Sequence, residues 1–177
     1  MKAAGGGFTL IELIVTVAIL AILATLAVPA FTSTVRRNCA ATSANAMLGL
    51  LTYARGEAVK RGVTVGLCPS TDGSSCGTDT DWGKGTMAYL LDSAGNQQVL
   101  RADIPITTCA SIASTNLNPA SPVQFTSTGR MQNSHADSTK SGGLTATPKQ
   151  HTAISRFVTV DPIGHIKVCD PTTVSQC

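Results

Sequence analysis

The hydrophobic pattern divides the chain into a long apolar beginning and a longer region of short, alternating runs. Residues 7–31 read GFTLIELIVTVAILAILATLAVPAF, and Glu12 is the only ionisable side chain among them. At about 1.5 Å per residue, residues 8–28 span roughly 30 Å, which is the thickness of a bilayer's hydrocarbon core. The pattern therefore predicts a transmembrane helix over residues 8–30.

Beyond Pro29 the apolar positions return at spacings near three and four, which is typical of an amphipathic helix. The apolar stripe consists of Val35, Cys39, Ala46, Leu50, Leu51, Ala54 and Ala58. It predicts that the helix continues over residues 31–62, stops at Gly62 and packs on a sheet through residues 48–58.

Residues 63–177 contain short runs separated by turn residues, which predicts a β-rich head. The predicted strands are 63–68, 85–92, 98–103, 123–126, 154–160 and 164–169. A turn is expected at 93–96, and Asp161-Pro162-Ile163-Gly164 should close a final hairpin. Residues 132–152 are rich in Ser, Thr, Gly and Lys, and we expect them to form a mobile surface excursion rather than core.

Six cysteines add a constraint: Cys39, Cys68, Cys76, Cys109, Cys169 and Cys177. Their spacing lacks the CxxC pairs of zinc sites, so disulfides outside the cytoplasm are expected after an apolar N-terminal segment. Cys68 and Cys76 flank a short Ser/Gly/Asp loop and form the first candidate pair. Cys169 and Cys177 could close a similar loop, which leaves Cys39 with Cys109. Six cysteines allow fifteen connectivities, so the pairing stays open.

The sequence contains no recognisable catalytic motif. His135, His151 and His165 are scattered, and the sequence has neither a GxSxG elbow nor a glycine-rich phosphate loop. The aspartates of TDGSSCGTDTD (71–81) lack the spacing of an EF-hand loop, so a solvated, disulfide-closed loop is favoured over calcium. We expect no catalytic residue, cofactor or metal. Trp82, the only tryptophan, is expected to be a buried anchor, with a partner-facing hot spot as the alternative.

Glu12 raises the main functional question. A charged side chain inside a membrane helix costs about 2.5–3.5 kcal/mol and usually has a partner. No Lys or Arg lies between Lys2 and Arg36, so the partner must come from elsewhere. A cut between Gly7 and Phe8 would create an α-amine that could meet this carboxylate on an adjacent, staggered copy. This arrangement predicts a filament contact, against the alternatives of a cleaved secretory signal or an ordinary signal anchor.

The stretch GFTLIE, followed by an apolar helix and Pro29, resembles the type IV prepilin signature. The resemblance implies cleavage by a prepilin peptidase after Gly7, N-methylation of Phe8, a filament-assembly role for Glu12 and a helix kink at Pro29. The distribution of charge does not favour this orientation. The positive-inside rule prefers a basic cytoplasmic flank, but only Lys2 precedes the apolar segment, whereas Arg36 and Arg37 follow it.

Further motifs resemble the GspH/FimT family of minor pilins and H-type pseudopilins: YARGEAVKRG (53–62), VTVGLCPS, DWGKG (81–85) and GHIKVC near the end. The resemblance implies an α+β, pilin-like fold with a long helix packed on an antiparallel β-sandwich-like head. It implies a leader (1–7), a membrane and assembly helix (8–30), an amphipathic continuation (31–62) and a periplasmic head (63–177). The implied function is that of a structural subunit near the tip of a type IV pilus or type II secretion pseudopilus.

The expected partners are other minor and major pilins or pseudopilins, the prepilin peptidase and the inner membrane. The chain would cross the inner membrane once and later join a periplasmic or extracellular filament. A soluble periplasmic binding module, released by signal peptidase with Phe31 as its first residue, is the alternative.

DNA binding for natural transformation is a further alternative, because some FimT-type pilins use a basic C-terminal GRxR motif. The matching positions are Gly164, His165, Ile166 and Lys167, so histidine and lysine stand where the family has arginines. Arg130 and Arg156 could extend such a patch. With so few firm charges, only weak and salt-sensitive contact with phosphates would follow.

Overall fold

The computed structural model describes residues 8–92, 95–115, 122–132, 142–149 and 154–170, without the side chains of residues 26–30 and 115. The chain divides into two compact units, residues 1–35 and 36–177, and we describe each by itself. The second unit, called the head below, contains the C-terminal half of a long helix and two sheets.

The helix α1 (Leu10–Arg61) is a single element of 52 residues, so the predicted segments 8–30 and 31–62 join. Its first turn is capped by Thr9, whose Oγ1 accepts the Glu12 amide hydrogen at an N···O distance of 3.3 Å. Its end is at the predicted glycine: Gly62 has a φ of 68°, and the Val63 amide donates to the Ala58 carbonyl. The helix continues through Pro29. The structure does not describe the side chains of residues 26–30, so the kink at Pro29 stays a prediction.

The first unit exposes its apolar side chains. Leu10, Ile11, Leu13 and Ile14 are 58–76% exposed, and Leu20 and Ile22 are similar. Among the described residues, no helix combines the length and the apolar character needed to cross a membrane.

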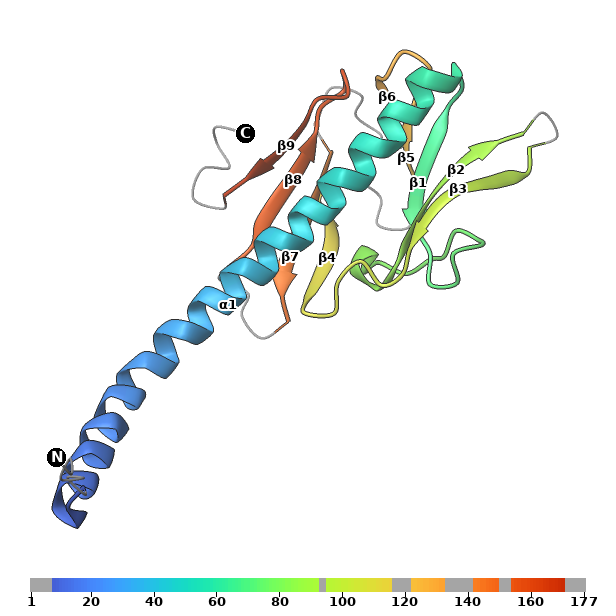
Figure 1. Cartoon of the computed structure of the whole chain (residues 1–177). Helices are drawn as coiled ribbons and strands as arrows, with labels where there is room; N and C mark the ends of the chain where they lie inside the picture. The colour runs from blue at the N-terminus through green and yellow to red at the C-terminus, as the bar shows by residue number, and fades with distance from the viewer. Residues whose placement is uncertain (1–7, 93–94, 116–121, 133–141, 150–153, 171–177) are drawn as a thin grey trace, which may run out of the picture. The chain divides into compact units, whose positions relative to one another are not determined.

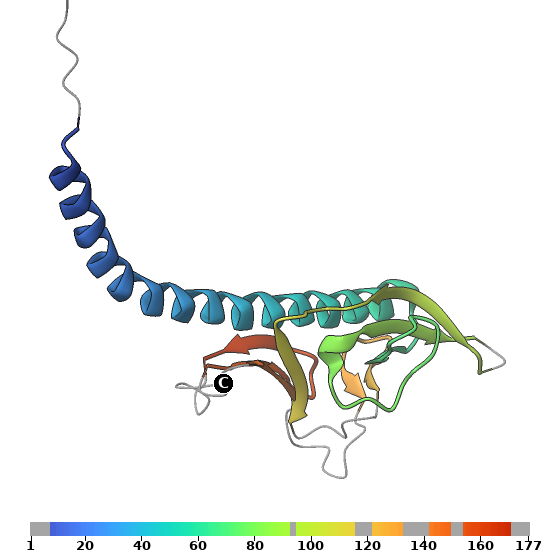
Figure 2. The ribbon, with the colours of Figure 1, turned by 90° about the horizontal axis from the view of Figure 1, so that it is seen from below.

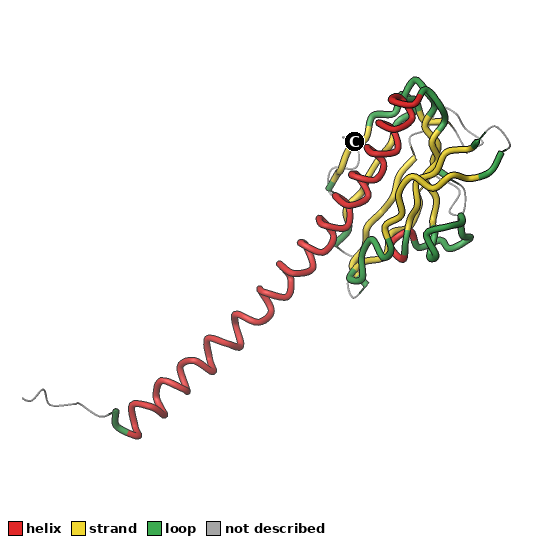
Figure 3. The backbone as a smooth tube through the Cα atoms, turned by 45° about the vertical axis from the view of Figure 1, so that its right-hand side comes forward, coloured by secondary structure: helices red, strands yellow, loops and turns green. Residues whose placement is uncertain are grey.

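In its described residues the head has nine strands in two antiparallel sheets, both on the same side of the head's part of the helix (Figures 1 and 2). Sheet A has the order β3-β2-β1-β5-β6, and sheet B has the order β4-β7-β8-β9. The strands of sheet A are β1 (Val65–Pro69), β2 (Thr86–Leu91), β3 (Gln97–Asp103), β5 (Val123–Phe125) and β6 (Met131–Gln132). The strands of sheet B are β4 (Ala110–Thr115), β7 (Gly142–Pro148), β8 (Arg156–Val160) and β9 (Ile166–Cys169). Figure 3 shows these strands in yellow beside the helix.

One apolar core joins the helix to both sheets, which confirms the α+β fold. Met47, Leu50 and Leu51 of α1 pack with Phe125 of sheet A and Leu144 of sheet B, all at most 1% exposed. The predicted stripe is therefore correct from Leu50 onward. At its start the prediction is wrong: Val35 is 50% exposed, and Ala40, Ser43 and Ala44 are the buried positions instead.

The prediction for residues 132–152 is wrong in part. Gly142–Pro148 forms β7, which lies between β4 and β8, and Leu144 and Ala146 of β7 belong to the core. Most strands are recognised by bulky apolar residues at alternating positions. The strand β7 instead contains small residues buried in the middle of the sheet, so this signal is absent from its sequence. The remaining residues of that stretch, 133–141 and 150–152, lie outside the described parts of the chain. The strands β4 and β6 were not predicted either.

Candidate functional site

The predicted cleavage and assembly positions lie at the beginning of α1. Phe8 is 81% exposed, and Glu12 lies in the first helical turn, where the amide dipoles favour a negative charge. Thr9 and Glu12 have the spacing of a capping box, and the Thr9 half of that motif is formed. Gly7, the other side of the predicted cut, lies outside the described residues, as does Lys2.

Two of the three predicted disulfides are present. Cys39 of α1 is bonded to Cys109, just before β4, and Cys68 of β1 is bonded to Cys76. The sequence separations are 70 and 8 residues. Cys169 is not a free thiol, but Cys177, with which we expected it to pair, lies outside the described residues. The smaller disulfide closes the loop that follows β1, as expected from its composition.

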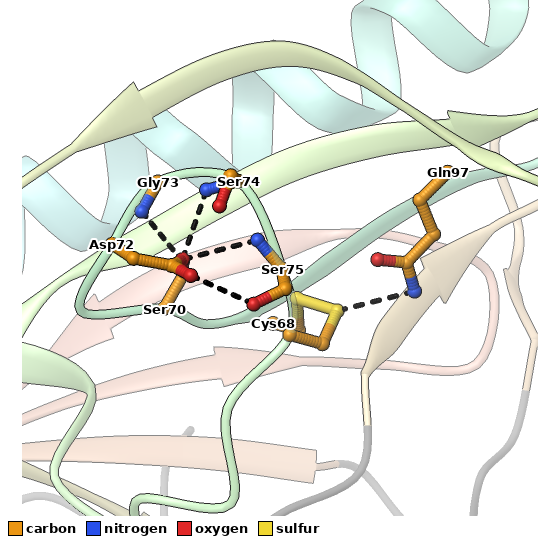
Figure 4. The surroundings of a disulfide bond; sticks show 8 residues. Cys68, Ser70, Asp72, Gly73, Ser74, Ser75 and Gln97 are labelled. Atoms are coloured by element: carbon orange, nitrogen blue, oxygen red, sulfur yellow. Dashed lines mark hydrogen bonds between the residues drawn. A yellow bond between two sulfur atoms is a disulfide. The ribbon is translucent and has the colours of Figure 1, made fainter.

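The loop closed by Cys68 and Cys76 is organised around one carboxylate (Figure 4). Asp72 Oδ1 accepts hydrogen bonds from the Ser74 and Ser75 amides at 2.9 and 3.0 Å. These backbone donors hold the pKa of Asp72 well below its usual range. Among the described residues, no group of three His, Cys, Asp or Glu side chains is placed to hold a metal ion. The disulfide encloses the first part of the TDGSSCGTDTD stretch, residues 71–75, as expected.

The DWGKG segment joins the two sheets. Trp82 begins the short 3-10 helix η1 (Trp82–Lys84) and is fully buried, which confirms it as an anchor rather than an exposed hot spot. Asp81 Oδ1 accepts the amide hydrogens of Gly83 at 2.9 Å and Ile112 at 2.8 Å. Asp81 thus caps η1 and also occupies part of the free edge of β4. Nothing in the sequence distinguished this aspartate from its neighbours.

Two of the residues considered for DNA contact meet at one end of the head. The turn 126–129 joins β5 to β6, and the turn 161–164 joins β8 to β9; Gly129 and Gly164 have φ angles of 76° and 85°. A Cβ on Gly164 would overlap the Gly129 carbonyl oxygen, so the two backbones touch. Arg130 and His165 follow these glycines and are both exposed.

Arg55 of α1 holds this junction from the helix side. Its Nε donates to the Gly129 carbonyl oxygen at 3.0 Å, and it also lies 3.0 Å from the Cβ position of Gly164. The sequence analysis missed this role. The signal was available, because 126–129 and 161–164 are both four-residue turns that end in glycine, but only the second was recognised.

The other two basic candidates are placed elsewhere. Arg156 of β8 forms an ion pair with Asp170, so its charge is already compensated. Lys167 is exposed on the edge strand β9. His135 and His151 lie outside the described residues. Of the proposed DNA-contact set, the fold therefore brings only Arg130 and His165 together.

We expect Gly164→Ala to destabilise the head by about 3 kcal/mol, because the methyl group would add backbone overlap to the strain of a positive φ. Gly95→Ala is the matched control, since Gly95 has the same φ of 85° with no atom within 4 Å of its Cβ position. It should cost about 1 kcal/mol. Urea unfolding of the full chain measures both, and equal costs would show that the two turns do not need their close contact.

A comparison with known protein families identifies the family to which the chain belongs. Residues 43–164 match the sequence profile of the family described as Type II transport protein GspH. The chain belongs to the GspH family. Residues 4–28 also match the prokaryotic N-terminal methylation motif. This GspH-family protein is a minor pilin or pseudopilin of a type IV pilus or a type II secretion system, as its motifs predicted.

Solved structures with the same fold come from both systems. The type IV minor pilin FimU of Pseudomonas aeruginosa is 20% identical, with a TM-score of 0.60 over 77% of this chain and 92% of FimU. The minor pseudopilin EpsH of the Vibrio cholerae type 2 secretion system is 17% identical, with a TM-score of 0.54 over 75% of this chain and 98% of EpsH. At such identities the likeness concerns the fold of this GspH-family protein.

Proposed function

We propose that the protein is made as a precursor, cut between Gly7 and Phe8 by a prepilin peptidase, and N-methylated on Phe8. Before assembly it is held in the bacterial inner membrane by residues 8–30, with the head in the periplasm. It then joins a filament near the tip, together with other minor and major pilins or pseudopilins. Its role is structural and not catalytic.

The observation that carries this proposal is the surface of the first unit. Its described large apolar side chains are at least 50% exposed, and they surround a single carboxylate one turn from the proposed new N-terminus. Such a surface requires an apolar environment, either lipid or a bundle of identical helices. Burying the Glu12 carboxylate in either setting requires a partner, and a neighbouring subunit's α-amine supplies one with the right charge.

Intact-mass analysis of the protein purified from membranes tests the processing step. We expect a mature chain that begins at Phe8 and carries one methyl group. Replacing Gly7 with Val should leave the precursor uncut, whereas Gly6→Ala should be processed normally, because it changes a neighbouring glycine that does not flank the cut. A mature chain beginning at Phe31 would contradict the proposal and favour the soluble periplasmic alternative.

A further inference from the structure

Three cations lie at the end of the head where α1 enters it. Arg36 and Arg37 begin the head's part of α1, and Lys149 directly follows β7. The Lys149 amide donates to the Cys109 carbonyl at an N···O distance of 3.1 Å. Cys109 is in turn bonded to Cys39, which lies in α1 close after the two arginines. These contacts place all three residues at one end of the head, where β4 begins and β7 ends (Figure 1), and we call them the basal cluster.

The charges of the basal cluster are not balanced within the described part of the chain. None of the three cations has an ion pair with a residue that the structure describes. By contrast, Arg156 of the adjoining strand β8 pairs with Asp170. Arg37 and Lys149 are exposed, and Arg36 is half-buried. The cluster therefore presents positive charge that is available to an external anion.

The chain keeps this cluster close to the predicted membrane helix. Arg36 follows residue 30 so closely that even a fully extended chain would separate them by at most about 20 Å. Exposed apolar side chains continue to Phe31 and Val35, which are 70% and 50% exposed, and the next two residues are the arginines. Such a change from apolar to basic side chains is typical of the position where a membrane helix reaches the lipid phosphates, because long cationic side chains extend toward them.

The arrangement of the cluster fits an extended anionic surface better than a single anion. Neighbouring residues of an α-helix point about 100° apart, so Arg36 and Arg37 lie on different sides of α1. Lys149 approaches from sheet B, on the side where Cys39 is bonded to Cys109. One phosphate or carboxylate on a single side of the helix would reach only part of this set. Lipid headgroups surround a helix on all sides where it leaves the bilayer, so they can contact all three cations.

We propose that the basal cluster binds the phosphate groups of anionic phospholipids in the periplasmic leaflet while the subunit is held in the inner membrane. Each lysine or arginine near an anionic surface strengthens binding about fivefold. The contact also accounts for the cations that follow the apolar segment, an arrangement that the positive-inside rule does not favour. The inference rests on the proposed function and adds a headgroup contact that must be released when the subunit enters a filament.

Native mass spectrometry of the full chain tests the contact, in detergent micelles with equal amounts of phosphatidylglycerol and phosphatidylcholine. We expect the wild type to retain the anionic lipid at least about tenfold more than the zwitterionic lipid at low salt. The preference should weaken at high salt, because salt screens the attraction. The variant Arg36→Gln/Arg37→Gln/Lys149→Gln should retain both lipids equally, and glutamine keeps a long polar side chain at each position.

The variant Lys60→Gln/Arg61→Gln/Lys167→Gln is the matched control, because it also removes three positive charges from the head. Lys60 and Arg61 are adjacent in the last turn of α1, and Lys167 lies on the edge strand β9. The control should keep the wild-type preference for phosphatidylglycerol. An equal loss of preference in both variants would overturn the inference, since net charge and not the basal cluster would then attract the lipid.

Incorporation of the same proteins into lipid nanodiscs separates this inference from the proposed membrane anchoring. If the wild type enters nanodiscs of either lipid but has no preference for phosphatidylglycerol in micelles, the inference fails and anchoring by residues 8–30 stands. A chain that enters neither kind of nanodisc would overturn both proposals. A basal-cluster variant that keeps the lipid preference but is absent from filaments would also overturn the inference and assign the cluster to a neighbouring subunit.

Discussion

Replacing Glu12 with Gln is expected to leave the protein in the membrane fraction but to remove it from assembled filaments. Glutamine keeps the size of the side chain and its hydrogen-bonding capacity, while it removes the negative charge. In the proposed filament the Glu12 carboxylate compensates the α-amine of a neighbouring Phe8. Loss of one partner from a buried ion pair costs about 3–5 kcal/mol, which corresponds to a decrease in incorporation of about 100-fold or more.

Membrane insertion should not be impaired by the same substitution. A neutral side chain at position 12 removes most of the cost of placing a charge in hydrocarbon, so insertion should be unchanged or slightly improved. Fractionation of cells into membrane and sheared filament fractions, with quantitative immunoblotting, measures both quantities.

Two further variants separate the intersubunit role of Glu12 from its local role in the helix. Thr9→Ala removes the cap whose Oγ1 accepts the Glu12 amide hydrogen, at a cost of about 1 kcal/mol, but leaves the charge in place. We expect near-normal incorporation for Thr9→Ala and partial incorporation for Glu12→Asp. If Glu12→Gln were incorporated as well as the wild type, Glu12 would serve only the cap and dipole of its own helix, and the ion-pair proposal would fail.

The parts of the fold that the sequence predicted correctly are those with strong local signals. The end of α1 at Gly62 follows from the need for a left-handed residue there, and the final hairpin follows from Pro162 and Gly164 in their turn positions. The loop between Cys68 and Cys76 was predictable because the short segment between the two cysteines, residues 69–75, has a turn-forming composition.

The parts that were missed depend on long-range packing. In β7 the buried residues include Gly142, Gly143 and Ala146, whose composition is typical of a loop, and only the pairing with β4 and β8 on either side makes them a strand. The pair Gly129 and Gly164 is separated by 35 positions, and only the arrangement of both sheets against Arg55 places these glycines in contact. The hydrogen bond from the Ile112 amide of β4 to Asp81 likewise joins residues that are far apart in the sequence. Candidate surfaces made from such contacts require the fold before they can be recognised.

The disulfide Cys39–Cys109 is expected to contribute more to stability than any other cross-link in the described residues. It joins α1 to the segment before β4 across 70 positions, and it lies four residues after the boundary between the two units. Constraining a loop of this length lowers the entropy of the unfolded chain by an amount worth about 4 kcal/mol. The corresponding value for Cys68–Cys76, with a separation of 8 residues, is about 2.5 kcal/mol.

The segment that contains Cys109 connects several elements, which adds to the expected effect. Ser43 of α1 donates to Thr107 Oγ1 at 2.9 Å, the Ile106 and Thr107 amides donate to the Gly83 carbonyl, and the Lys149 amide donates to the Cys109 carbonyl. Without the disulfide, the first turns of the head's helix would keep the packing of Ala40 and Ala44 and the Ser43 hydrogen bond to Thr107. We therefore expect the helix to separate locally from the head around residues 36–43.

Double alanine variants of each disulfide, compared in the full chain by urea unfolding and amide hydrogen exchange, measure this difference. Cys39→Ala/Cys109→Ala should lose about 4 kcal/mol and show faster exchange in residues 40–44, whereas Cys68→Ala/Cys76→Ala should lose less and change exchange mainly in residues 70–77. Unfolding under reducing conditions is the control, since it should bring the wild type below both variants. A larger loss for the shorter loop would show that burial of Cys68, and not the closure of the long loop, determines the contribution of the disulfides.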